Sequence, residues 1–131
     1  MTFDPNGDEE FRRERHVGIW AEPGIGPAVW DREGCAVLPE ALPISSALRG
    51  RFENWWSWFE FTTIFTRNAA YRGKRIDGAE YAAEGRAIAA AIKRELPDWT
   101  VVFVDQHLRQ TLPADTPFAA YTFEIGLTEN D

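Results

Sequence analysis

Residues 52–65 read FENWWSWFEFTTIF, which places three tryptophans and four phenylalanines on one short segment. The segment continues a helical pattern predicted from about Ala47 to Arg67, with Ser45 or Ser46 as its N-cap. One face of this helix carries a broad apolar stripe, which we expect to pack in the core of the protein. The stripe comprises Leu48, Phe52, Trp55, Trp56 and Phe59.

A second apolar stripe flanks the first and contains Trp58, Phe61 and Phe65. If another element covers these rings they belong to the core, because each buries roughly 150–250 Å². If they are exposed, they form a patch typical of a partner-binding site or of a homodimer interface. The carboxylates of Glu53 and Glu60 would then steer a basic protein partner towards the rings.

The rest of the chain alternates short apolar runs with turn residues, which predicts strands, and contains one alanine-rich helical pattern. Strands are expected at 16–20, 28–30, 35–38, 99–104 and 118–125, and the second helix from a capping box at Asp77 and Glu80 to Leu96. This order predicts an α+β domain, with a small antiparallel or mixed sheet of four to five strands packed with two α-helices. Whether the helices share one face of the sheet stays open.

The ends of the predicted domain follow from composition. Residues 1–15 carry several carboxylates and few apolar side chains, so we expect a disordered acidic lead-in. Residues 16–131 are expected to form a single domain, since their number is typical of one.

The charge of the chain excludes some classes of partner. With 21 acidic and 14 basic residues its net charge is -7, which argues against binding to nucleic acid or to anionic membranes. A lone cysteine, Cys35, forms no internal disulfide, and the sequence contains neither a signal peptide nor a membrane-spanning apolar run. We therefore expect a cytoplasmic protein.

An alternative site is predicted where the strand at 99–104 ends. Asp105 and His107 could act as an acid/base pair there, with Arg109 as a third polar group of a small-molecule site or an active site. No nucleophile in a recognisable setting accompanies them, so the sequence favours a protein without enzymatic activity. His16, His107 and Cys35 show no spacing typical of metal ligands, and we expect neither a metal nor a cofactor.

Four stretches of the chain resemble a family of small, uncharacterised bacterial proteins. They are VGIWAE, AVWDREG, LPISSALRGRFENW and YAAEGRAIAAAIKRELPDWTVVFVD, and they span residues 17 to about 105. The pattern consists of a W-D-x-x-G turn, an L-P-I-S-x-x-L helix start and an A-E-G-R helix. The resemblance implies a bacterial, cytoplasmic protein and no assigned activity, and the aromatic density of residues 55–65 departs from the pattern.

These observations together favour a protein-binding module. The acidic charge, the lack of catalytic groups and the aromatic helix are typical of a small immunity or antitoxin-like inhibitor of another protein. A small-molecule site near Asp105 and His107, and a homodimer assembled through the aromatic helix, are the alternatives.

Overall fold

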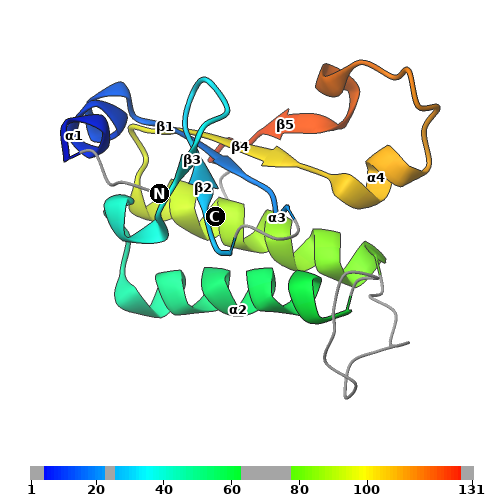
Figure 1. Ribbon diagram of the computed structural model, residues 1–131, viewed down its shortest axis with the longest axis horizontal. Coiled ribbons are helices and arrows are strands. Elements are labelled where there is room, and N and C mark those ends of the chain that lie inside the picture. Colours follow the sequence, from blue (N-terminus) through cyan, green and yellow to red (C-terminus); the bar gives the residue numbers. More distant parts are fainter. Residues whose placement is uncertain (1–4, 23–25, 63–77, 128–131) are drawn as a thin grey trace.

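The computed structural model describes residues 5–22, 26–62 and 78–127. Figure 1 shows a sheet with two long helices beneath it and a short helix near each end of the strands. In chain order the elements are α1 (Pro5–Glu14), β1 (His16–Ile19), β2 (Val29–Trp30), β3 (Ala36–Val37), the 3-10 helix η1 (Pro39–Ala41), α2 (Ser46–Thr62), α3 (Gly78–Glu95), β4 (Thr100–Val104), α4 (Gln106–Gln110), the 3-10 helix η2 (Phe118–Tyr121) and β5 (Thr122–Glu124).

The five strands form one mixed sheet in the order β3-β2-β1-β4-β5. β1 and β4 are parallel, while the other neighbouring strands are antiparallel. The register places Gly18 opposite both Trp30 and Val102, and Val102 opposite Glu124. Because residues directly opposite each other point to the same face, these four share one face of the sheet. The predicted α+β fold with a mixed sheet is confirmed.

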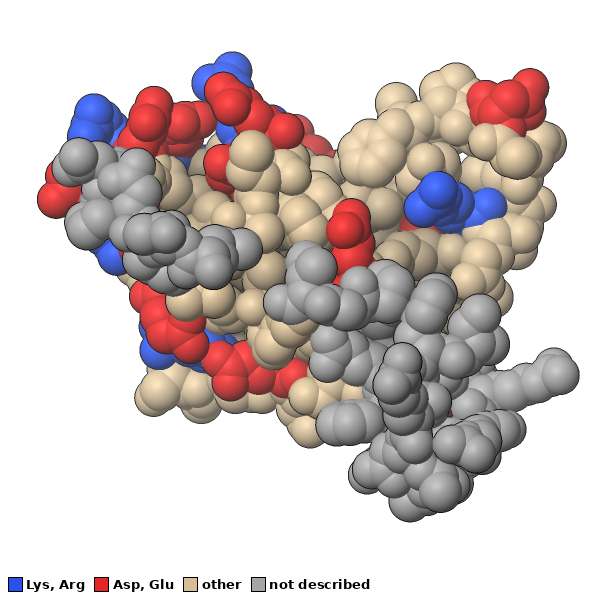
Figure 2. All heavy atoms as spheres, viewed as in Figure 1, with Lys and Arg blue, Asp and Glu red and all other residues tan. Residues whose placement is uncertain are grey.

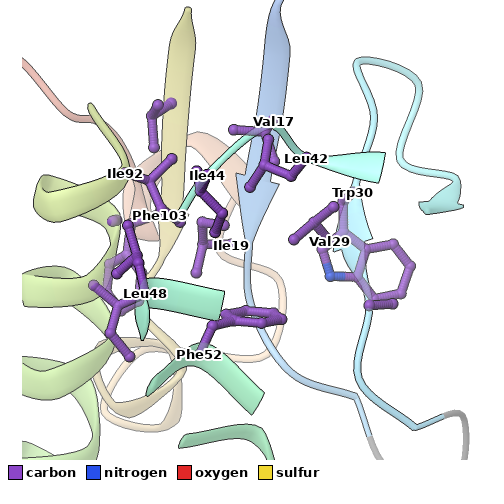
Figure 3. Close-up of a cluster of buried hydrophobic side chains, with 14 of the residues drawn as sticks. Val17, Ile19, Val29, Trp30, Leu42, Ile44, Leu48, Phe52, Ile92 and Phe103 are labelled. Atoms are coloured by element: carbon purple, nitrogen blue, oxygen red, sulfur yellow. The ribbon is translucent and has the colours of Figure 1, made fainter. Parts of the chain in front are cut away.

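The other face of the sheet carries the core. Ile19 and Phe103 are paired in register and are 0% and 1% exposed. Figure 3 shows them facing Leu48 and Phe52 of α2 and Ile92 of α3. Both long helices therefore cover the same face, which answers the question that the sequence left open (Figure 1).

The predicted core stripe of the aromatic helix is buried. Leu48, Phe52, Trp55 and Trp56 are 0–6% exposed, while the side chain of Phe59 lies outside the described residues. The described helix runs from Ser46 to Thr62, and the predicted extension to Arg67 also lies outside them.

Helices α2 and α3 are joined by aromatic and charged contacts. Trp55 stacks on Tyr81 with ring centroids 4.6 Å apart, and its Nε1 donates to the Tyr81 carbonyl at 3.0 Å. Burial raises the pKa of the Tyr81 phenol well above its usual value. At the surface, Arg51 donates two hydrogen bonds to the carboxylate of Glu84, at 3.0 and 2.7 Å.

The N-terminal segment differs from the predicted disordered lead-in. Pro5–Glu14 is a helix, α1, and its Phe11 is only 3% exposed. The Phe11 ring meets Trp99 edge-on at 5.3 Å, and Arg12 Nε donates to the Ala41 carbonyl at 3.0 Å. A single apolar residue among charged ones gave too weak a periodic signal for a helix to be predicted.

The segment between β4 and β5 also differs from the prediction, which placed a strand at 118–125 and no helix before it. Gln106–Gln110 forms helix α4, and Phe118–Tyr121 is a 3-10 helix, so that the last strand is reduced to Thr122–Glu124. Thr122 Oγ1 donates to the Phe118 carbonyl at 2.7 Å, which closes this turn. In Figure 1 the residues between α4 and β5 form an arm that rises on the side of the sheet away from α2 and α3.

Candidate partner-binding surface

The partner-binding residues predicted on the aromatic helix are only partly described. Glu53 and Trp58 are half-buried, and the side chains of Glu60 and Phe61, together with Phe65, lie outside the described residues. The Trp58 ring meets Tyr81 edge-on at 5.7 Å and packs against the core cluster. The described member of the second stripe thus contributes to the packing of α2 on α3.

The alternative site residues lie together around α4, but their contacts differ. Asp105 is the N-cap of α4, because its Oδ1 accepts a hydrogen bond from Leu108 N at 2.8 Å. Its Oδ2 lies 3.8 Å from Nη2 of Arg86 on α3. His107 is exposed, and its ring lies so close to Gly78 at the start of α3 that a Cβ there would collide with it. Asp105 thus caps α4, while His107 lies at the surface beside the start of α3.

Arg109, the third residue of the alternative site, lies beside a cavity. Its guanidinium stands 5.7 Å from the ring centroid of Tyr121, the last residue of η2. The cavity measures about 400 Å³ and is lined by residues of α4 and of the arm, with Gln110, Leu112 and Thr116 also among them. Among the described residues, no group of three or more His, Cys, Asp or Glu side chains is placed to hold a metal ion.

An aromatic cluster on the face of the sheet away from α2 and α3 was not predicted from the sequence. Trp20 folds back over Gly18 and stacks on Trp30, with ring centroids 4.6 Å apart and an interplanar angle of 4°. Trp30 Nε1 donates to the Trp20 carbonyl at 2.9 Å, which fixes the pair. A side chain at Gly18 would collide with the Trp20 ring, so glycine is what permits this arrangement.

The cluster continues into the arm. Phe118 meets Trp20 edge-on at 6.3 Å and Tyr121 edge-on at 5.4 Å. Phe118 is 53% exposed, whereas Trp30 and Tyr121 are 5% and 8% exposed. We call Trp20, Trp30, Phe118 and Tyr121 the aromatic ridge. Its two inner rings are buried, and its two outer rings, those of Trp20 and Phe118, meet solvent.

Carboxylates border the aromatic ridge. Trp20 Nε1 donates to Glu22 Oε1 at 3.3 Å, and the exposed Glu124 shares the row of Gly18 and Val102 on the same face. In Figure 2 charged side chains gather over the upper left of the molecule, whereas the arm at the upper right presents mostly uncharged atoms. The surface is therefore apolar at its centre and acidic at part of its rim.

Comparison with known proteins supplies the class of this protein. A family model described as Serratia CdiI immunity protein-like matches residues 15–106. The chain belongs to that family. The matched range begins at the end of α1 and ends in the first turn of α4, so it contains the whole sheet except β5. It also closely matches the range over which the sequence resembles a family of small bacterial proteins.

Membership supports the interpretation as an immunity protein in general terms. It supports a protein as the partner, in keeping with the description of the family as immunity protein-like. No curated protein and no solved structure matches the chain. Within the described part of the chain, no helix combines the length and the apolar character that crossing a bilayer requires.

Proposed function

We propose that this protein is an immunity protein that binds a toxin of contact-dependent inhibition and neutralises it. The observation that carries the proposal is the family match over residues 15–106. Asp105, one of the two predicted acid/base residues, accepts a hydrogen bond from Leu108 N and so has a structural role as the N-cap of α4.

Neutralisation requires that the bound protein cover a surface on which the toxin depends. Two surfaces of this chain are candidates for that contact. One is the second stripe of α2, with Trp58, Phe61 and Phe65 as apolar anchors and with Glu53 and Glu60 as steering charges. The other is the aromatic ridge on the opposite face of the sheet. Both would suit a basic partner, because the chain has a net charge of -7.

Co-expression tests the proposed function directly. Each toxin domain of contact-dependent inhibition encoded in the genome that carries this chain is induced in a sensitive host, with and without the protein. We expect growth to be restored against one toxin domain and the two chains to co-purify. Ile19→Asp is the control for folding, because it places a carboxylate at a site that is 0% exposed, and it should abolish protection. If wild-type protein restores growth against none of the toxin domains, the proposed function is wrong.

A further inference from the structure

The aromatic ridge has the construction of a binding anchor. Trp20 rests on the buried Trp30, and the hydrogen bond from Trp30 Nε1 to the Trp20 carbonyl holds the two segments together. A ring that is already fixed loses little conformational entropy when a partner covers it. Phe118 extends the apolar surface and is the most exposed large apolar side chain among the described residues, at 53%. Aromatic side chains of this kind are enriched at the centres of protein interfaces.

The ridge lies on the face of the sheet that α2 and α3 do not cover. Helices α2 and α3 cover the face of Ile19 and Phe103, so the ridge belongs to the face that they leave free (Figure 1). The row that crosses this face passes from Trp30 through Gly18 and Val102 to Glu124. Val102 is half-buried and Glu124 exposed, so the apolar surface continues from the ridge across the sheet to an acidic edge.

The charges at the rim indicate the chemistry of the partner. Glu22 accepts a hydrogen bond from Trp20 and is exposed, and Glu124 stands at the other end of the row. In the turn between β2 and β3, Asp31 Oδ1 accepts hydrogen bonds from the backbone N–H groups of Glu33 and Cys35, each at 2.9 Å. This turn directly follows Trp30 in the sequence and contains the exposed carboxylate of Glu33. The rim also holds two basic side chains, Arg32 in the same turn and Arg109, whose guanidinium stands 5.7 Å from the ring centroid of Tyr121. The rim is therefore mixed at these two places and acidic at Glu22 and Glu124.

We propose that the toxin docks on this face of the sheet, away from α2 and α3, with Trp20 and Phe118 as its apolar anchors and with Glu22 and Glu124 as steering charges. This inference rests on the proposed function and deepens it by naming the surface. The complementary toxin surface is an apolar depression flanked by lysine or arginine side chains. The ridge is favoured over α2 because it carries Phe118, which is 53% exposed, whereas Trp58 is half-buried and meets Tyr81 edge-on.

The test measures binding of purified variants to the toxin domain that wild-type protein neutralises, in a form inactivated for handling. Phe118→Lys removes the exposed ring and adds a charge that repels a basic surface. Leu127→Lys is its matched control, because Leu127 is 51% exposed and lies beyond the other end of β5. We expect Phe118→Lys to raise the Kd by about 30-fold or more, as for an interface hot spot, and Leu127→Lys to leave it within about threefold.

Charge reversal gives a second measurement that does not depend on the aromatic packing. Glu22→Lys combined with Glu124→Lys should lower the association rate constant by about tenfold at low salt, and the difference should shrink in 0.5 M NaCl. Glu53→Lys on α2 is the control. Thermal unfolding of each variant verifies that it is folded.

Each outcome decides between the surfaces. If wild-type protein binds the toxin, and both Phe118→Lys and the double charge reversal bind it as tightly, the docking surface is wrong while the proposed function stands. Loss of binding in Glu53→Lys alone would assign the contact to α2 instead. If the wild-type protein neutralises no toxin domain, the proposed function fails, and this docking surface fails with it.

Discussion

Gly85 of α3 lies directly against the indole of Trp55 of α2. A Cβ at residue 85 would come within 2.6 Å of Trp55 Cζ2 and within 2.7 Å of Phe103 Cε1, so three elements meet at this glycine. Neither ring is free to move aside. Trp55 is 2% exposed and its Nε1 donates a hydrogen bond to the Tyr81 carbonyl, and Phe103 is 1% exposed. The absence of a side chain at Gly85 thus sets how closely α2, α3 and β4 approach one another.

Gly85→Ala is therefore expected to destabilise the protein, although alanine is the better helix former. Overpacking a core costs about 1–3 kcal/mol, which over most of that range exceeds the gain of about 1 kcal/mol in helix propensity. Urea denaturation measures the difference. Gly50→Ala on α2 is the matched control: nothing lies within 4 Å of a Cβ at residue 50, so it should stabilise by about 0.5–1 kcal/mol. Equal gains in both variants would show that the helices can separate without cost.

Ser45 and Glu95 join the start of α2 to the end of α3. Ser45 Oγ caps α2 by accepting from Leu48 N at 3.2 Å, and the Glu95 carboxylate accepts from Ser45 N at 2.6 Å and from Ser45 Oγ at 2.7 Å. Ser45→Ala should cost about 1 kcal/mol, as for loss of an N-cap. In a Glu95→Gln background the same substitution should cost less, by about 0.5 kcal/mol or more, because the two residues share hydrogen bonds. Strictly additive unfolding free energies would contradict this coupling.

The regular elements of the fold could be predicted because their signals are local. The stripe of Leu48, Phe52, Trp55 and Trp56 repeats at helical spacing, and the apolar run of β4 is bounded by Pro97 and Asp105. Helix α4 was missed because five residues give no periodicity, although Asp105 as an N-cap was a usable signal.

The aromatic ridge could not be predicted in this way, because its residues come from three separate segments. Trp20 and Trp30 meet only because β1 and β2 are neighbours, and Phe118 reaches Trp20 only because β5 pairs with β4 beside β1. Strand order is a global property, and the parallel pairing of β1 with β4 has no local sequence signal. Within the strand predicted at 16–20, alternation alone places Gly18 and Trp20 on the face opposite Val17 and Ile19.

Tyr81 predicts an alkaline limit to stability. Burial raises the pKa of its phenol in the folded protein, so the phenol ionises more readily in the unfolded chain. Ionisation of Tyr81 therefore leaves the free energy of unfolding unchanged below the ordinary tyrosine pKa of about 10, and lowers it as pH rises above that value. At pH 11 this residue alone should lower the free energy of unfolding by about 1.4 kcal/mol. Urea denaturation of wild-type protein and Tyr81→Phe at pH 8, 10 and 11 isolates the effect. The difference between the two proteins should change by about that amount between pH 8 and pH 11, and a constant difference would refute the assignment.

Phe11 tests whether the N-terminal segment contributes to the stability of the protein. Its ring is 3% exposed and packs edge-on against Trp99, whereas the neighbouring Glu10 is exposed. Phe11→Ala should cost about 3 kcal/mol, as for truncation of a buried phenylalanine, and should alter the fluorescence of Trp99. Glu10→Ala on the same helix should change stability by less than about 0.5 kcal/mol. If Phe11→Ala leaves both the free energy of unfolding and the fluorescence unchanged, α1 adds nothing to the core. Residues 1–15 would then behave as the acidic lead-in that their composition suggests.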